Sequence, residues 1–175
     1  MSFKIFPDIL KQIESLSDKE REKIHVLFTE LGPSYSLQKE IVEYILDIRG
    51  RDKVSVEEII NQKIEKTLNN YNIPREKKLN QIRAYLRQVR FPLLFTAEEI
   101  FRSKLKSLNL PSGCDIIPPS YWEDGEYKLR LNFKNAIEFS EKLQQLFKIS
   151  QTKAWQELIG EQWFETLFSS KGIHR

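Results

Sequence analysis

The chain has 175 residues and a net charge of +3, with 40 % hydrophobic and 30 % charged residues, a balance typical of one globular domain or two small ones. No apolar run approaches the roughly 18 residues of a membrane-spanning helix, and no charged-then-apolar segment opens the sequence as a secretion signal would. Cys114 is the only cysteine, so no internal disulfide can form and a cytoplasmic location is expected.

Residues 1–72 are predicted to form a helical bundle, because apolar residues recur at helical spacing between short breaks at Pro33 and Gly50. Four helices are expected here, at about 6–15, 18–31, 37–49 and 56–69. Their core is expected to hold Leu27, Phe28, Leu31, Ile41, Ile45, Leu46, Ile59, Ile60 and Ile64. The second and third helices could also form a helix-turn-helix, although helical hairpins are too common for this to be specific.

Four helix starts carry the spacing of a capping box, in which an N-cap side chain and an acid three residues later each accept from the other's backbone N–H. The pairs are Ser17–Glu20, Ser55–Glu58, Thr96–Glu99 and Asn135–Glu138. They predict that helices begin directly after residues 17, 55, 96 and 135.

Residues 73–95 are predicted to be a basic connecting helix and loop, with the helix at about 74–89. Beside its apolar stripe, the helix carries Arg83, Arg87 and Arg90 at spacings of four and three. Residues 75–106 hold nine Lys or Arg against three acids, an excess that favours a polyanionic partner. Because guanidinium groups bind phosphate through two hydrogen bonds, the stripe predicts contacts to DNA or RNA. Carboxylates from a neighbouring helix are the alternative partners.

Residues 96–149 are predicted to form a small α-β-β-α module, followed by a C-terminal helix and tail at 150–175. Helices at about 97–109 and 136–148 flank strands at 114–117 and 126–133, and a last helix at 151–168 is expected to break near Gly160. The second strand alternates, which predicts one buried apolar face. A two-stranded sheet leaves an edge and a face to cover, so a homodimer is expected. Its interface is expected to include Tyr127, Leu129, Leu131, Phe133 and Leu143.

Enzyme signatures are absent from the sequence, so no catalytic residue, metal site or cofactor is predicted. His25 and His174 are isolated, and Cys114 has no predicted base beside it, so each is expected to be structural or solvated. Tyr121 and Trp122, in the link between the strands, are expected to pack on the protein's own core, with base stacking as the alternative. A carboxylate pair hidden in a cleft is the remaining route to an enzyme.

Several segments between residues 97 and 148 follow one another in a familiar order. They are 96–99 with a helix closing at Leu110, a strand at 115–117, the alternating run 125–133, and 136–139 with 143–146. This order resembles the C-terminal dimerisation domain of the ParB chromosome-partitioning family, over less than a third of the chain. The resemblance implies a homodimer whose strands pair into one sheet. It also implies a basic surface, with Lys104, Lys106, Lys128 and Arg130, that holds DNA without reading its sequence.

The resemblance has limits. The link between the strands is longer than in the family, and neither the family's nucleotide-binding boxes nor its site-specific DNA-binding domain has a counterpart in this sequence. Nucleotide-dependent clamping and recognition of a fixed DNA site are therefore not implied.

Together these patterns predict a predominantly helical α+β protein that is not an enzyme. Its expected function is DNA binding as a homodimer through phosphate contacts, with RNA left open. The expected donors are Lys78, Arg83, Arg87, Arg90, Lys104, Lys106, Lys128 and Arg130. The alternative function is a protein-protein adaptor, or a subunit of a larger complex, whose basic surface meets an acidic partner.

Overall fold

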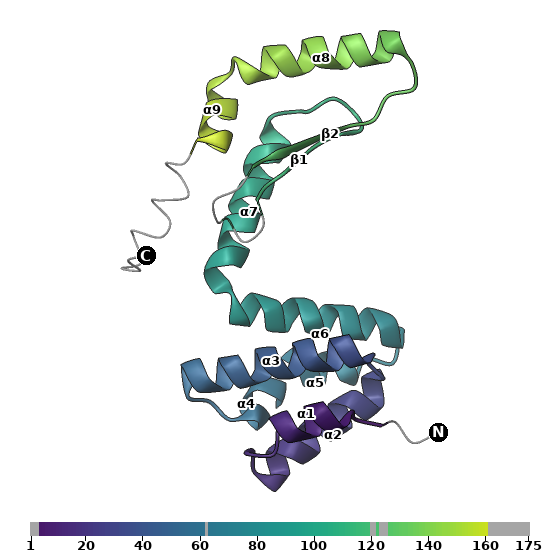
Figure 1. Ribbon diagram of the computed structural model, residues 1–175, viewed down its shortest axis with the longest axis vertical. Coiled ribbons are helices and arrows are strands. Elements are labelled where there is room, and N and C mark those ends of the chain that lie inside the picture. Colours follow the sequence, from purple (N-terminus) through teal and green to yellow (C-terminus); the bar gives the residue numbers. More distant parts are fainter. Residues whose placement is uncertain (1–3, 62, 120–121, 123–125, 161–175) are drawn as a thin grey trace. The chain divides into compact units, whose positions relative to one another are not determined.

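The computed structural model describes residues 4–61, 63–119, 122 and 126–160. The chain divides into two compact units, Met1–Phe91 and Pro92–Arg175. Helices dominate both units, and the described residues contain one sheet of two antiparallel strands (Figure 1), which confirms the predicted α+β class. None of the described helices is long and apolar enough to cross a membrane.

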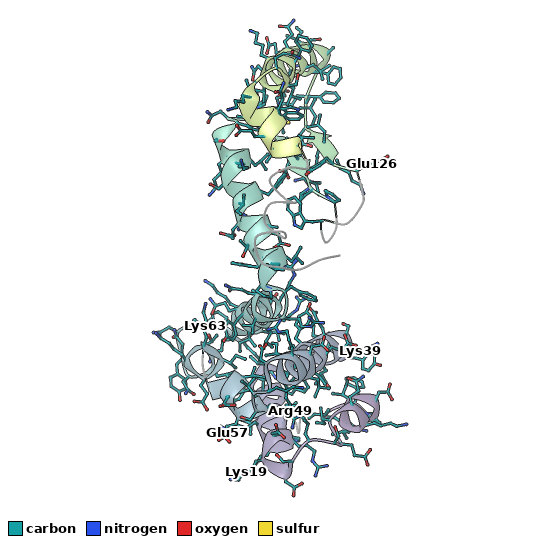
Figure 2. All side chains as sticks on the ribbon, turned by 90° about the vertical axis from the view of Figure 1, so that its left-hand side faces the viewer. Lys19, Lys39, Arg49, Glu57, Lys63 and Glu126 are labelled. Atoms are coloured by element: carbon teal, nitrogen blue, oxygen red, sulfur yellow. The ribbon has the colours of Figure 1, made fainter. Side chains whose placement is uncertain are left out.

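The N-terminal unit is a helical bundle. Its helices are α1 (Pro7–Gln12), α2 (Asp18–Leu31), α3 (Tyr35–Asp52), α4 (Val56–Asn61), α5 (Lys63–Leu68) and α6 (Arg75–Arg90). The predicted core residues are buried, except Leu46, which is partly buried at the edge of the core. Charged side chains such as Lys19, Lys39, Glu57 and Lys63 point outward and are exposed (Figure 2). The basic helix α6 is part of this bundle, with Leu79, Ile82 and Leu86 buried in its core.

Local signals set most helix boundaries in this unit. The Ser17–Glu20 and Ser55–Glu58 capping boxes are both formed, so α2 and α4 begin where the sequence predicts. The predicted break at Gly50 is wrong, because α3 continues through it to Asp52. A single glycine costs a helix only about 1 kcal/mol, which the buried apolar face of α3 offsets.

A buried carboxylate ties three of the bundle helices together. Glu20 accepts from Nε of Arg49 at 2.9 Å, from the backbone N–H of Val56 at 3.2 Å and from the N–H of Ser17 at 3.1 Å. The hydrogen bond from Arg49 is the main reason that the pKa of Glu20 falls from 4.5 to about 2. Burial alone would raise this pKa, so the donors outweigh desolvation and keep the carboxylate charged.

The C-terminal unit contains a helix, a hairpin and two further helices. They are α7 (Pro92–Ser107), β1 (Cys114–Ile117), β2 (Lys128–Leu131), α8 (Ala136–Ser150) and α9 (Lys153–Ile159). Of the predicted helix at 151–168, the structure describes α9, which has Thr152 as its N-cap and Gly160 as its C-cap. Residues 161–168 lie outside the described residues, as does Tyr121. Trp122 is 7 % exposed with its ring 5.1 Å from that of Phe101, so its predicted packing on the protein's own core is confirmed.

Of the two predicted helix starts in this unit, the one after Thr96 is wrong and the one after Asn135 is confirmed. The helix α7 begins at Pro92 rather than after Thr96, because proline suits the first turn of a helix, where its missing N–H is not needed. Thr96 is therefore inside the helix, and its hydroxyl donates to the carbonyl of Pro92 at 2.9 Å. The helix α8 begins at Ala136, where the Asn135 side chain caps it by accepting from the N–H of Glu138. Only the reciprocal half of the capping box differs, because the Glu138 carboxylate accepts from the backbone N–H of Lys134 instead of that of Asn135.

Candidate protein-interaction site

The arginine stripe of α6 is engaged within the N-terminal unit. Arg83 donates from Nε and Nη2 to both carboxylate oxygens of Glu40 at 2.8–3.1 Å. Arg90 donates from Nε to Asp47 at 2.6 Å, and both acids belong to α3. Pairing with acids of a neighbouring helix, the alternative that the sequence left open, is thus what the structure shows for these two arginines.

The other two predicted donors of α6 also have interaction partners, and that of Lys78 lies inside this unit. The Lys78 ammonium donates to the carbonyl of Leu68 and lies 5.8 Å from the ring centre of Tyr71, so it holds the turn between α5 and α6. Arg87 has an interaction partner as well. Arg83 and Arg90 of the stripe therefore hold α6 in the bundle, and the stripe does not offer three free guanidinium groups to a ligand.

The predicted cations of the C-terminal unit fall into two groups. Lys104 lies 3.9 Å from Glu157 of α9, and Arg130 lies 2.8 Å from Asp115, its cross-strand neighbour. Lys106 and Lys128 are exposed, and no carboxylate of the described residues lies within ion-pair distance of either. They are the predicted phosphate donors of this unit that form no ion pair with a described carboxylate.

The prediction that one face of the second strand is buried is wrong for a single chain. Leu129 and Phe133 are 53 % and 52 % exposed, while Leu131 is half-buried. Tyr127 stacks on Phe101 with ring centres 6.1 Å apart. The described part of the chain therefore covers only part of the apolar face that the alternation correctly outlines. None of the described elements covers Leu129 and Phe133 enough to remove them from water.

Helix α8 carries a second exposed apolar row, which the sequence analysis did not single out beyond Leu143. Phe139, Leu143 and Phe147 are spaced by four residues and are all exposed, Phe147 to 68 %. The helix turns a different side inward, with Lys142 and Leu146 buried. Spacing of four was visible in the sequence, but which side of α8 packs inward depends on tertiary contacts.

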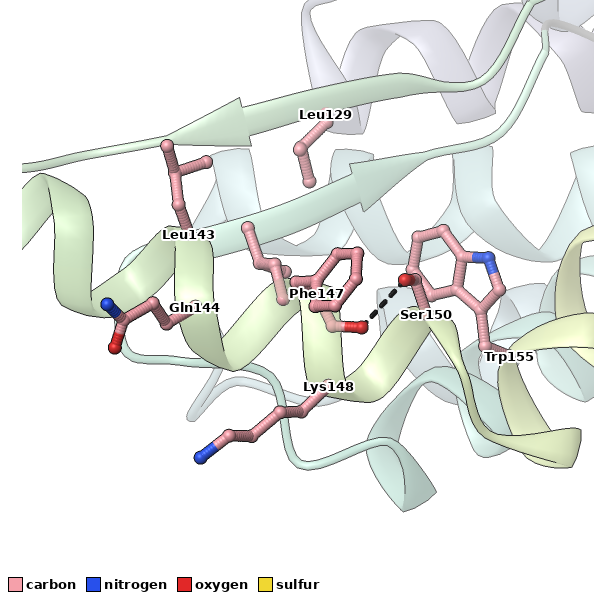
Figure 3. Close-up of a pocket in the computed structure, with 8 residues that line it drawn as sticks. Leu129, Leu143, Gln144, Phe147, Lys148, Ser150 and Trp155 are labelled. Atoms are coloured by element: carbon pink, nitrogen blue, oxygen red, sulfur yellow. Dashed lines mark hydrogen bonds between the residues drawn. The ribbon is translucent and has the colours of Figure 1, made fainter.

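An open apolar groove of about 650 Å³ joins these two rows. It is lined by Leu129, Leu143, Gln144, Leu146, Phe147, Lys148, Ser150 and Trp155. Figure 3 shows Leu129 of β2 and Leu143 and Phe147 of α8 around the same space. Ser150 donates to the carbonyl of Phe147 at 2.8 Å, so its hydroxyl is already bonded within α8. We call the groove and the exposed residues Leu129, Phe133, Phe139, Leu143 and Phe147 the β2–α8 surface.

The outer edge of β2 adjoins this surface and is open. The N–H of Asn132 donates to the carbonyl of Gly113 at 2.9 Å and continues the β1–β2 register. Hydrogen-bonded positions alternate along an antiparallel pair, so the backbone of Arg130 points toward β1 while that of Leu129 and Leu131 points outward. Among the described residues, no strand pairs with this outer edge.

A buried lysine holds α8 against the end of the hairpin. The Lys142 ammonium donates to the carbonyl of Asn132 at 2.7 Å and pairs with Glu138 at 2.8 Å. The hydrogen bond from Lys142 lowers the pKa of Glu138 below its usual value. This anchor fixes the first half of α8 relative to β2, and therefore the width of the groove between them.

The described residues offer little chemistry for catalysis. None of their His, Cys, Asp and Glu side chains form a group of three or more that could hold a metal ion. Burial raises the pKa of the Cys114 thiol, which disfavours the reactive thiolate. Among the described residues of the C-terminal unit, the extended exposed feature is the β2–α8 surface, which is apolar.

Comparison with known proteins adds no relative: no family model, no curated protein and no solved structure matches the chain. The resemblance of residues 97–148 to the ParB dimerisation domain therefore stays a prediction.

Proposed function

We propose that this chain is a non-enzymatic binding protein that works as a homodimer, with the β2–α8 surface of its C-terminal unit as the contact. The observation that carries the proposal is the exposure of Leu129, Leu143 and Phe147 around one groove. Exposed hydrophobic residues scattered singly are ordinary on a protein surface, whereas a contiguous group of them marks an interaction site.

The open strand edge supports a second copy as the partner. The backbone groups of Leu129 and Leu131 point outward, and the side chains of the same two residues lie on the apolar face. A strand added at this edge therefore extends the apolar face instead of interrupting it. The β2 strand of a second chain meets this requirement, because it carries the same alternation.

The mass of the full chain in solution tests the proposal. Sedimentation velocity at tens of micromolar should give twice the mass of one chain, with a monomer appearing on dilution. A monomer across the whole concentration range would overturn the proposal.

DNA binding is the second candidate function, and its donors now lie in the C-terminal unit. Lys106 and Lys128 are exposed and lie beyond ion-pair distance of any described carboxylate, whereas Arg83 and Arg90 are paired. Phosphate contacts release counterions, so affinity for unrelated duplexes should fall steeply with salt. Replacing Lys106 or Lys128 by Ala should lower that salt slope by roughly one ion each. No duplex binding at low salt would instead favour an acidic protein surface as the partner of these lysines.

A further inference from the structure

The alternating residues around β2 also indicate the register in which two chains pair. We infer that the β2 strands of two chains pair antiparallel along their outer edges, with Arg130 of one chain beside Arg130 of the other on the two-fold axis. The inference rests on the proposed homodimer and names the residues that face each other across it.

The direction of the backbone groups limits the possible registers. The backbone of Arg130 and Asn132 points toward β1, so Leu129, Leu131 and Phe133 offer their N–H and C=O groups to the outer edge. Each hydrogen-bonded pair across the contact needs such outward groups from both strands. The two-fold axis can therefore pass beside residue 129, 130, 131 or 132, and each choice brings different residues face to face.

The apolar face favours the axis at residue 130. In that register Leu129 faces Leu131 of the other chain and Tyr127 faces Phe133, so all four apolar positions of the strand meet apolar partners. A shift of the axis by one residue in either direction sets one of the two aromatic residues opposite a glycine or an asparagine. The register at residue 130 also covers Leu129 and Phe133, which are 53 % and 52 % exposed in one chain.

The charges on the polar face select the same register. Lys128 then faces the neutral Asn132, and Glu126 faces Lys134, an opposite charge, on both sides of the axis. Glu126 and Lys134 are exposed, and neither forms an ion pair with another described residue. An axis at residue 129 sets Lys128 against Arg130, and an axis at 131 sets it against Lys134. Like charges directly opposite each other destabilise a sheet, so these two registers are disfavoured.

The contact between Arg130 and Asp115 has a role in this register. Facing residues that share no backbone hydrogen bond have Cα atoms about 4.5 Å apart, so the two Arg130 side chains would repel each other. Asp115 is the neighbour of Arg130 on β1, and its carboxylate lies 2.8 Å from the guanidinium. The axis is therefore crossed by a row of acid, base, base and acid, in which Asp115 of each chain offsets the repulsion at the centre.

Cysteine cross-linking reads the register directly in the full chain. Cys114→Ser removes the only cysteine, and this background should dimerise as the wild type does. Arg130→Cys added to it should form a covalent dimer on mild oxidation, because the facing pair lies within disulfide distance. Lys128→Cys and Asn132→Cys are the matched controls. Each alone should form little covalent dimer, whereas an equimolar mixture of the two should cross-link, since these positions face each other.

Charge reversal tests the same register without cysteine. Glu126→Lys and Lys134→Glu each replace two attractions by two repulsions, and each should raise the dimer dissociation constant about tenfold, less at high salt. The double variant should return to the wild-type constant. Glu141→Lys makes the same change of charge on the side of α8 away from Leu143, and it should leave the dissociation constant unchanged.

The outcomes separate the register from the homodimer itself. A wild-type dimer whose variants cross-link faster at residue 128 or 132 than at 130, or at none of the three, overturns the register and leaves the homodimer standing. The same conclusion follows if the double charge reversal fails to restore the dissociation constant. A wild-type monomer overturns both the homodimer and the register.

Discussion

Arg83 and Glu40 join α6 to α3 through a two-pronged ion pair with N–O distances of 2.8–3.1 Å. Arg90 and Asp47 repeat the contact seven positions later on each helix, and both pairs are separated by 43 residues in sequence. A constant offset requires that the two helices run in the same direction. At the end of the row, Arg51 of α3 donates to the last carbonyls of α6, those of Val89 and Arg90. Arginines thus fix the register of α6 on α3.

This register predicts that Arg83→Ala lowers the free energy of unfolding by about 1 kcal/mol. Hydrogen bonds to charged groups contribute roughly 1.5–3 kcal/mol, and partial exposure of Arg83 and Glu40 screens part of that. Chemical denaturation measures the change. Lys77→Ala, at an exposed position of the same helix, should be nearly neutral. If the effects of Arg83→Ala and Glu40→Gln simply add in a double variant, the two side chains are not coupled.

Glu20 gives a second prediction, with a pH dependence. Glu20→Gln should destabilise the N-terminal unit by about 2 kcal/mol at neutral pH, because the charge that Arg49, Val56 and Ser17 bind is lost. The pKa of Glu20 is depressed from 4.5 to about 2, so its contribution is complete above 4.5 and disappears as the pH falls toward 2. The stability gap between wild type and variant should therefore narrow on acidification. If the difference in unfolding free energy between wild type and Glu20→Gln stays the same from neutral pH down to the pKa of about 2, the charged carboxylate does not stabilise the unit in this way.

Two glycines of the same unit should respond in opposite directions to alanine. Gly32 has φ +52, and a Cβ there would lie 1.9 Å from Nη2 of Arg75, which donates to the carbonyl of Thr29 near the end of α2. Gly32→Ala should lower the free energy of unfolding by about 1–2 kcal/mol, because alanine is strained in the left-handed backbone conformation. The melting temperature should fall accordingly. Gly50 is inside α3 with nothing within 4 Å of a Cβ. Gly50→Ala should stabilise the unit by roughly 0.5–1 kcal/mol, since alanine favours helix. Equal effects of the two changes would contradict the backbone described for α3.

Local chemistry was the part of this fold that could be predicted from sequence. The Ser17–Glu20 box acts over three residues, and the start of α2 followed from it. The start of α7 could not be predicted in this way, because two local signals compete there. The proline at 92 outweighs the Thr96–Glu99 spacing, and the helix begins at Pro92. The arginine stripe was visible as a pattern, but its choice between solvent and Glu40 depends on an offset of 43 residues that no local rule sets.

The same distinction applies to the candidate site. Alternation correctly placed Leu129 and Leu131 on one face of β2, since opposite faces follow from strand geometry alone. How far that face is covered depends on α8, which Lys142 anchors at the carbonyl of Asn132. The exposed row with Phe147 could be recognised only once Leu146 was known to point inward.

The last prediction separates assembly from folding at neighbouring positions of α8. Phe147 is 68 % exposed and lines the groove, so Phe147→Glu should leave the chain folded but place a charge inside the proposed dimer contact. Burying an unpaired charge costs several kcal/mol, so this variant should be a monomer at tens of micromolar with an almost unchanged helical circular dichroism spectrum.

Two companion variants complete this comparison. Gln145→Glu, which introduces the same charge outside the groove lining, should dimerise as the wild type does. Leu146→Glu should instead unfold the C-terminal unit, because Leu146 is buried within the chain. Sedimentation and thermal melting on the three variants give the answer. If Phe147→Glu dimerises normally, the surface around Phe147 is not the contact between the chains. If it melts like Leu146→Glu, the row of Phe139, Leu143 and Phe147 is packed within a single chain.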